Sequence, residues 1–468
     1  MKAQFLTLTA AAMLCGAAPA AAQLASAPTL APALVTTTAL PSTPAVDAYY
    51  AARANAPIWF RDASSLTAAK LLPAILERAS LDGLDNGPDL ARQVDAALAR
   101  VENAPLGAQP PTKPATFLAE DKLLSAAWVQ YVRALKAPVP GITYGDPALA
   151  PKAPTPDRIL VDAARAPSLL GHVRAVAAVN PIYAQLRDAA LAQMASQMQS
   201  GGGLAPDPRL LANLQRARII PSSGRYIVVN AATARLSMFE NGVQVDTMKV
   251  VVGKPKTPTP MLAGTIHYVT VNPYWNVPTD TAREEVAPIV LKRGVKYLAL
   301  ARYEVASDWT NQSTAVDPAT IDWKAVAAGT TQVHIRQLPG PDNMMGAIKF
   351  GFANELGIYL HDTPKREYFA RARRNYSHGC IRLEDAQRFG RWLLGREPVA
   401  PSTGPEQHLQ IAKGVPVFIT YLTAVPGVDG GPLTFADDVY GRDPKADTGL
   451  ADVKLATIPS HTAAATPR

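Results

Sequence analysis

The sequence predicts an α+β protein in which a helix-rich region is followed by a strand-rich one. Leu71, Leu72, Ile75 and Leu76 recur at the spacing of one helix face, and this periodicity indicates amphipathic helices. From Tyr226 onward, β-branched runs and alternating patterns replace it, which is typical of strands. Further helical patterns lie around residues 89–101, 117–136, 158–166 and 182–198.

The strand-rich region begins with a predicted hairpin. Residues 226–230 and 235–239 form two β-runs, and Asn241-Gly242 then precedes a third run at 243–245. Asn-Gly between such runs is a strong signal for a tight hairpin turn. The stretch from about 280 to 330 has helical and irregular character, which indicates an insertion. Other strands are predicted at 248–252, 265–271, 332–337, 356–361 and 415–422.

Length and charge limit the classes of function. The chain has 468 residues, which is too long for one ordinary core and indicates two or three domains. The formal net charge of +8 suits an anionic partner such as nucleic acid, a cell-wall polymer or a membrane surface. The sequence contains no nucleic-acid-binding motif, and we expect no nucleic-acid partner.

The first residues have the pattern of a secretory signal. Met1-Lys2 is followed by an apolar run that ends near Ala18, and Ala20-Ala21-Ala22 fits a cleavage site. We expect cleavage after Ala22, and a retained membrane anchor is the alternative. No other stretch approaches the roughly 18 uninterrupted apolar residues of a membrane span.

These patterns divide the chain into segments. Residues 23–44 are almost uncharged and rich in Ala, Pro, Ser and Thr, which is typical of a linker. We expect a signal peptide at 1–22, a flexible linker at 23–44, a helical domain at 45–217, a strand-rich domain at 218–443 with an insertion at about 282–330, and a disordered tail at 444–468.

The cysteine count draws attention to one position. The chain has two cysteines, and signal cleavage would remove Cys15 and leave Cys380. A lone cysteine in an exported protein is an inert buried thiol, an intermolecular bridge or a reactive nucleophile.

Cys380 lies close in sequence to two histidines. His378 precedes it by two residues, and His361 ends a predicted strand. Because 15 residues separate His361 from Ser377, the connecting loop is long enough to return to the strand end and bring Cys380 beside His361. A neighbouring base is what a thiol needs in order to act as a nucleophile near neutral pH.

The residues around Cys380 favour chemistry as well. Gly379 permits a turn that directs successive N–H groups at one point, as an oxyanion hole requires. Glu384-Asp385 begins a helical pattern that Gly395 ends. Cys380 therefore precedes a helix N-terminus, and we expect the positive end of the helix dipole to favour its thiolate.

Two other interpretations of this segment exist. Cys380 could be a small buried cysteine near two incidental histidines. Alternatively, His361, His378 and Cys380 could bind zinc, although the two histidines lack the usual short metal-ligand spacing to the cysteine.

These residues resemble the signature of the L,D-transpeptidases of the YkuD type. That signature is a histidine, then fourteen to seventeen residues, then Ser/Thr-His-Gly-Cys. Here His361 and Ser377-His378-Gly379-Cys380 match it position by position. Papain-like and related cell-wall peptidases place the cysteine before the histidine, and this chain has the reverse order.

The resemblance covers most of residues 45–443 and is most specific in 218–443. It points to the large, scaffold-bearing (YcbB-like) subgroup of Gram-negative bacteria, in which Arg is common at the position of Arg382. That subgroup usually has a peptidoglycan-binding domain, for which residues 185–210 leave no room. The matching segments include Arg225–Asn230, Val251–Pro255, Asn272–Pro278, Lys349-Phe350 and Tyr359–Pro364, with Tyr49-Tyr50 and Leu81–Leu84 in the helical domain.

The resemblance implies a mixed β-sandwich catalytic domain with an inserted lid-like subdomain, preceded by an α-helical scaffold domain. It also implies a periplasmic transferase of peptidoglycan biosynthesis, with a role in cell-wall biogenesis and cell shape. A cysteine thiolate attacks the L,D amide between meso-diaminopimelate and the terminal D-alanine of a tetrapeptide stem. D-Alanine leaves, a thioester forms, and the side-chain amine of a second stem resolves it into a 3→3 cross-link.

The resemblance also assigns roles by position. Cys380 is the nucleophile, and His361 is the base with a backbone carbonyl as its orienting partner. The other positions are loop or oxyanion-hole residues (Ser377, His378 and Gly379) and substrate-binding residues (Tyr359, Trp275 and Arg382). We expect no metal and no cofactor, and the expected partners are peptidoglycan tetrapeptide stems and other cell-wall enzymes.

Alternatives to cross-linking stay open at this point. The same acyl-enzyme could pass its stem to a protein amine or to water. A non-catalytic envelope scaffold that only binds peptidoglycan needs neither His361 nor Cys380, so their presence argues against that class. The basic residues between these two positions could bind stem carboxylates or form a solvated loop face. They are Lys365, Arg366, Arg371, Arg373 and Arg374.

Overall fold

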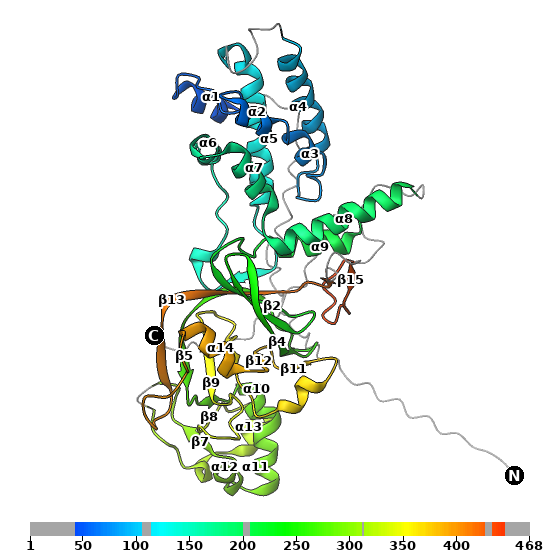
Figure 1. Ribbon diagram of the computed structural model, residues 1–468. Coiled ribbons are helices and arrows are strands. Elements are labelled where there is room, and N and C mark those ends of the chain that lie inside the picture. Colours follow the sequence, from blue (N-terminus) through cyan, green and yellow to red (C-terminus); the bar gives the residue numbers. More distant parts are fainter. Residues whose placement is uncertain (1–42, 105–113, 200–205, 311–312, 426–432, 445–468) are drawn as a thin grey trace, which may run out of the picture. The chain divides into compact units, whose positions relative to one another are not determined.

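The computed structural model describes residues 43–104, 114–199, 206–310, 313–425 and 433–444 (Figure 1). The predicted signal peptide and almost all of the predicted linker and tail lie outside these ranges, so they stay predictions. Across the described ranges, no helix is both long enough and apolar enough to cross a bilayer.

The region before residue 218 is mainly helical, as the periodicity predicts, but Ile142–Tyr144 forms a strand (β1) that pairs in parallel with a strand of the later sheet. Several of its helices begin at side-chain caps: Asp62, Thr155 and Ser168 each accept a hydrogen bond from a backbone N–H of the first turn. The helices are α1 (Pro44–Ala51), α2 (Ala63–Ala69), α3 (Leu72–Glu77), α4 (Gly87–Glu102), α5 (Leu118–Leu135), α6 (Pro156–Arg165), α7 (Leu169–Ala178), α8 (Pro181–Gln199) and α9 (Pro208–Ala217).

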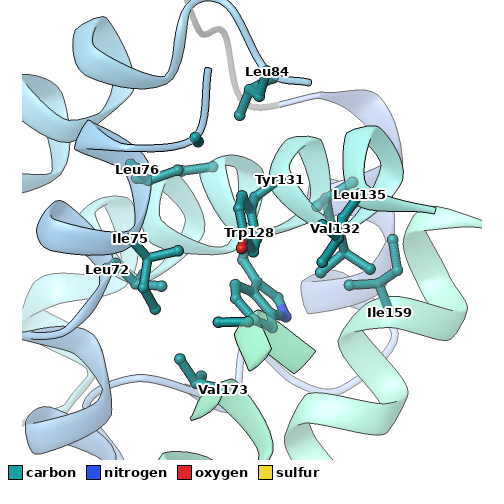
Figure 2. Packing of buried hydrophobic residues seen from close by; sticks show 14 of the residues in the cluster. Leu72, Ile75, Leu76, Leu84, Trp128, Tyr131, Val132, Leu135, Ile159 and Val173 are labelled. Atoms are coloured by element: carbon teal, nitrogen blue, oxygen red, sulfur yellow. The ribbon is translucent and has the colours of Figure 1, made fainter. Parts of the chain in front are cut away.

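Trp128 of α5 lies in the core of these helices. It is fully buried, and Figure 2 shows it amid side chains such as Leu72 of α3 and Val173 of α7. Beside this core, the buried carboxylate of Asp82 accepts a hydrogen bond from the Tyr131 hydroxyl and pairs with Arg187 of α8. A buried charge is tolerated when it is paired and hydrogen-bonded in this way, so this contact fixes the turn after α3 against α8.

Most strands of the second region, together with β1 from the helical region, form one mixed sheet, whose pairings run in the order β1-β5-β13-β2-β3-β4-β12-β10-β9, with β11 paired to β4. Because β9 also pairs with β5, the path closes on itself around an apolar core. The predicted α+β class and mixed β-sheet are confirmed. The strands are β1 (Ile142–Tyr144), β2 (Arg225–Asn230), β3 (Arg235–Glu240), β4 (Val243–Gly253), β5 (Met261–Val271), β9 (Ile348–Gly351), β10 (Leu360–His361), β11 (Asn375–Ser377), β12 (Ile381–Leu383) and β13 (Gln407–Thr420).

The predicted hairpin and the predicted helix after Leu383 are both present. Asn241 and Gly242, between β3 and β4, have positive φ angles of 51° and 82°, as a tight hairpin turn requires. Helix α14 (Ala386–Leu394) ends at Gly395 in the left-handed conformation. Its Phe389 packs on Phe350 of β9, with ring centroids 4.7 Å apart, so α14 covers one side of the sheet core.

The insertion has a core of its own. A three-stranded sheet in the order β6-β8-β7 packs with short helices around Val286, Val290 and Ile335. The core draws on residues on both sides of the predicted limits, because β6 and β8 flank the helices. The elements are β6 (Trp275–Asn276), α10 (Thr279–Thr281), a π-helical turn (Ala282–Val286), α11 (Ala287–Arg293), α12 (Lys296–Leu300), β7 (Tyr303–Ala306), α13 (Trp323–Ala328) and β8 (His334–Gln337).

Candidate active site

Side-chain alternation on β10 and β12 defines the face that carries the candidate site. Leu360 and Ile381 are register partners and are buried in the sheet core. Their neighbours along each strand must point to the opposite face, because successive side chains alternate. We call this opposite face the site face. It carries Tyr359, His361, Cys380 and Arg382.

The parallel pairing of β10 with β12 brings Cys380 next to the end of β10. The Ile381 N–H donates to the carbonyl oxygen of Tyr359 at 3.0 Å, and His361 is the register partner of Arg382. Cys380 therefore lies alongside Tyr359, directly before the strand that pairs with His361. The expectation that the connecting loop returns to the end of the strand is confirmed.

The imidazole of His361 is held in one tautomer. Its Nδ1 lies 2.5 Å from the carbonyl oxygen of Asp362, and because a carbonyl only accepts, Nδ1 carries the proton. This is the backbone-carbonyl partner that the resemblance implies. The arrangement leaves the lone pair on Nε2, which is the atom that a general base needs.

His361 is also kept neutral. The residue is only 2% exposed. Burial lowers the pKa of His361 to about 3, and the nearby cations Arg382 and Lys349 act in the same direction against the Asp362 hydrogen bond. A neutral imidazole is thus present at any pH near neutrality.

Cys380 rests as a protonated thiol, which corrects the expectation of a thiolate favoured by a helix. Burial raises the pKa of Cys380, although hydrogen bonds from Tyr359 and the cations Lys349 and Arg382 oppose this rise. Its Sγ lies 3.6 Å from the Gly357 carbonyl oxygen, to which the thiol donates. The helix fails to contribute because β12 separates Cys380 from α14, whose N-terminus is capped by its own aspartate.

The loop before Cys380 is held by a short hydrogen-bond chain. The Gly379 N–H donates to Ser377 Oγ at 3.1 Å, and Ser377 Oγ donates to the Cys380 carbonyl oxygen at 2.6 Å. Thr259 Oγ1 donates to the Gly379 carbonyl oxygen at 2.7 Å. Ser377 therefore clamps the loop, and the N–H of Gly379 is directed at Ser377. This contact supports the loop role expected of Ser377 and Gly379, and a role in an oxyanion hole stays a prediction.

Gly379 shapes the loop through its backbone. Its φ angle is +119°, and an added Cβ would lie 3.2 Å from Cδ1 of Ile358. Residues with a side chain rarely adopt such an angle, so the position requires glycine on both conformational and steric grounds.

The imidazole of His378 contacts residues other than Cys380 and His361. Its Nε2 accepts a hydrogen bond from Lys254 Nζ at 2.9 Å, and Glu285 of the insertion lies 3.7 Å away. This Nε2 is therefore engaged with a lysine, which does not suit a zinc ligand. No group of three or more potential metal ligands occurs among the described residues.

Trp275 is placed in the core of the insertion. Its ring centroid lies 6.2 Å from that of Tyr303, and β6 pairs it with Gln337 of β8. Trp275 is partly buried and packs against the core of the insertion, and its expected role in substrate binding stays a prediction.

Much of the basic run between the two candidate catalytic positions is structural. Arg374 is largely buried and donates to backbone carbonyls that include those of Val250 and Ala234. Arg366 pairs with Asp362 and Arg373 with Asp437, each at 2.6 Å. These contacts satisfy three of the cations within the protein and leave little support for their binding stem carboxylates.

Lys349 is a site-face residue to which the sequence assigned no role. It is the antiparallel register partner of His361, and its Nζ lies 4.8 Å from the centroid of the Tyr359 ring. A lysine between the two buried neighbours Ile348 and Phe350 is the pattern that would have indicated a strand with one face outside the core.

Comparison with protein families identifies two regions. Residues 224–419 match the L,D-transpeptidase catalytic domain (YkuD), and residues 44–189 match the Scaffold domain. A Haemophilus influenzae protein described as an L,D-transpeptidase is 31% identical over 242 residues, which are 50% of this chain and 48% of that protein. The chain thus spans about half the length of that relative.

Solved structures of L,D-transpeptidases show weaker similarity. The Mycobacterium smegmatis enzyme is 14% identical with a TM-score of 0.22, covering 42% of this chain and 59% of that one. L,D-transpeptidase 3 from Mycobacterium tuberculosis, in complex with a faropenem-derived adduct, is 14% identical with a TM-score of 0.22, covering 42% and 61%. The assignment rests instead on the family matches, the first of which contains both His361 and Cys380: residues 224–419 match the YkuD L,D-transpeptidase catalytic domain, and residues 44–189 before them match a scaffold domain.

Proposed function

We propose that this protein is a periplasmic L,D-transpeptidase that forms 3→3 cross-links between meso-diaminopimelate residues of peptidoglycan. The observation that supports this most directly is the placement of Cys380 directly before β12, the strand that pairs with His361. The fixed Nδ1–H of His361 leaves Nε2 free to take the thiol proton. The match of residues 224–419 to L,D-transpeptidase catalytic domains supports the class of reaction.

Acylation begins with both partners neutral. Nε2 of His361 accepts the proton of Cys380 as Sγ attacks the carbonyl carbon between meso-diaminopimelate and D-alanine. The tetrahedral intermediate collapses when its C–N bond breaks. The imidazolium then returns the proton to the leaving amine of D-alanine, and a thioester remains on Cys380.

Transfer reverses these roles. The side-chain amine of a second stem attacks the thioester carbonyl carbon, and His361 accepts one of its protons. The C–S bond breaks, and the proton passes to Sγ, which restores the thiol. Lys349 and Arg382 disfavour a lasting imidazolium, so the proton is passed on at each step and is not stored on His361.

Substitution of Cys380 tests this proposal. Purified tetrapeptide muropeptides are incubated with the wild type and with Cys380→Ala, and the products are analysed by mass spectrometry. The wild type is expected to make 3→3 dimers and a thioester adduct, and the variant neither. His378→Ala is the comparison variant: it removes a loop residue whose Nε2 is bonded to Lys254, and it should still give both products, at a reduced rate.

The same products separate the alternatives. Tripeptide monomers without dimers would mean trimming by water, and stems linked to an added protein amine would mean protein attachment. Dimers that persist in Cys380→Ala would refute the proposed nucleophile. An envelope scaffold that only binds peptidoglycan would give no thioester with any of these variants.

A further inference from the structure

Two cations flank His361 on the site face. Lys349 on β9 and Arg382 on β12 are both register partners of His361, one on each side. Register partners on adjacent strands lie roughly 5 Å apart and point to the same face. The side chains of Lys349, His361 and Arg382 therefore form one row across the sheet.

Neither cation of this row forms an ion pair within the described residues. The Nζ of Lys349 lies over the Tyr359 ring, and the Arg382 guanidinium lies 5.7 Å from the centroid of the Tyr368 ring. The Nε of Arg382 is buried and has no hydrogen-bond partner. Glu285 and Glu367 influence Arg382 only from beyond ion-pair distance.

Two partly buried cations without a paired carboxylate create positive potential beside the nucleophile. Anions are attracted to such a place, and a carboxylate can accept charge-assisted hydrogen bonds from a lysine and an arginine together. The row lies two residues along the strands from Cys380 and Tyr359, which is roughly 6.6 Å. Long side chains can span this distance toward a group near the scissile bond.

We propose that Lys349 and Arg382 bind the α-carboxylate of the amino acid whose amine leaves from, or attacks at, the acyl carbon on Cys380. This inference rests on the proposed function and specifies its acyl acceptor. In the leaving D-alanine, the carboxylate is attached to the carbon next to the scissile nitrogen. It therefore lies within a few bonds of the carbon that Sγ attacks.

We call Lys349 and Arg382 together the carboxylate clamp. The same clamp serves the second half of the reaction, in which the acyl group is transferred to the second amine. The attacking amine enters where the leaving amine departed, because transfer is the reverse of acylation with a different amine. The reactive end of meso-diaminopimelate carries an amine and a carboxylate on one D-configured carbon, as D-alanine does. A lysine side chain of a protein has no carboxylate on the carbon that bears its amine, and water has none. The clamp thus selects stems over protein amines and water.

Acceptor competition tests this selection. The enzyme is first converted completely to the thioester with tetrapeptide, and transfer to D-methionine is compared with transfer to D-methioninamide, which lacks the carboxylate. The wild type should transfer to D-methionine at least about tenfold faster, as expected for a charge-assisted contact. In Lys349→Met, which keeps the apolar stem, the preference should fall below about threefold.

Two variants serve as controls. Lys349→Arg should keep the preference because it keeps the charge. Lys254→Met removes a lysine that contacts His378 and not the row, so it should behave like the wild type. An unchanged preference in Lys349→Met, with the thioester still formed, would overturn the clamp. A preference lost equally in Lys254→Met would also overturn it, because the effect would then be one of overall charge.

A second measurement does not depend on the proposed function. The rates of alkylation by iodoacetate and by iodoacetamide are measured on the peptide that carries Cys380. The ratio of the iodoacetate rate to the iodoacetamide rate should fall severalfold in Lys349→Met and stay constant in Lys254→Met. If the wild type forms no thioester with tetrapeptide, the proposed function fails, and this ratio still decides whether Lys349 attracts an anion to the thiol. An equal ratio in all variants would overturn the clamp.

Discussion

At the scale of single residues, the protonation states of His361 and Cys380 are the most informative property of the site. His361 is neutral because burial and the cations Lys349 and Arg382 all lower its pKa, and Cys380 is protonated because desolvation raises its pKa against the effect of the same two cations. An activated thiolate–imidazolium pair would place a third positive charge in that row. The resting site is therefore a neutral pair that forms charge only while a substrate is being attacked.

The low pKa of His361 makes folding sensitive to acid. Its pKa is about 3 in the folded protein against the ordinary histidine value of 6.5, so its full contribution is present above 6.5 and is lost as the pH falls toward 3. Between pH 7 and pH 5 the linkage amounts to about 2 kcal/mol. Urea denaturation at the two pH values should show this loss in the wild type and a smaller one in His361→Gln. His378→Gln, at an exposed imidazole, should keep the wild-type loss.

The sequence predicts the identity of these two residues but not their protonation. The spacing from His361 to Cys380 and the turn at Gly379 are local features of the sequence, so they can be predicted without knowing the fold. By contrast, both pKa shifts arise mainly from burial in the folded sheet, and the cations that add to the shift of His361 come from β9 and β12, whose register with His361 is a product of the sheet. The sequence indicates the position of Lys349 beside His361 only through the alternation of buried Ile348 and Phe350 with Lys349.

At the scale of elements, the loop of residues 377–380 is the part that local chemistry specifies best. Ser377 and Thr259 hold three of its backbone groups, and Gly379 supplies a φ angle of +119°. The hairpin at Asn241-Gly242 and helix α14 are predictable for the same reason, because their turn and cap residues act locally. Strands of two or three residues, such as β1 and β10, are too short for apolar and polar residues to alternate in a pattern that predicts a strand. They form because β5 and β12 pair with them.

Substitution of Gly379 tests the importance of the loop geometry. Gly379→Ala forces a side chain into a left-handed angle and against Ile358, which costs about 1–3 kcal/mol locally. We expect acylation of Cys380 by tetrapeptide to slow by more than about tenfold while the circular dichroism spectrum stays native. Gly395→Ala is the matched control, because its φ is +68° with open space around it. Equal effects of the two variants would contradict a role for the loop geometry.

At the scale of the whole molecule, α9 is tied to the last described segment of the chain. Arg216 of α9 pairs with Asp443 at 2.7 Å, and both side chains are almost completely buried. Arg216 also donates to the carbonyl oxygens of Tyr421 and Arg442. The helical region before residue 218 and the strand-rich region after it are thus linked by a buried charge pair, which residue patterns in either region alone do not indicate.

This pair should dominate the stability of that link. Asp443→Asn leaves the buried guanidinium of Arg216 without its counter-charge, and we expect the free energy of unfolding to fall by about 3 kcal/mol or more. Asp437→Asn removes the partner of Arg373 in an exposed pair and should lower it by less than about 1 kcal/mol. Urea denaturation of both variants measures the contrast. A similar loss in the two would show that the Arg216–Asp443 pair is no more than a surface contact.

The protonated thiol of Cys380 also determines how durable the nucleophile is. Peroxides and disulfide exchange consume thiolates, and a thiol that donates to a carbonyl and keeps its proton reacts slowly with either. In oxidising surroundings, such a cysteine resists conversion to sulfenic acid and to adventitious mixed disulfides. The burial that keeps Cys380 protonated between reactions therefore also protects the thiol from oxidation. The thiolate forms only when a substrate carbonyl is already in place for attack.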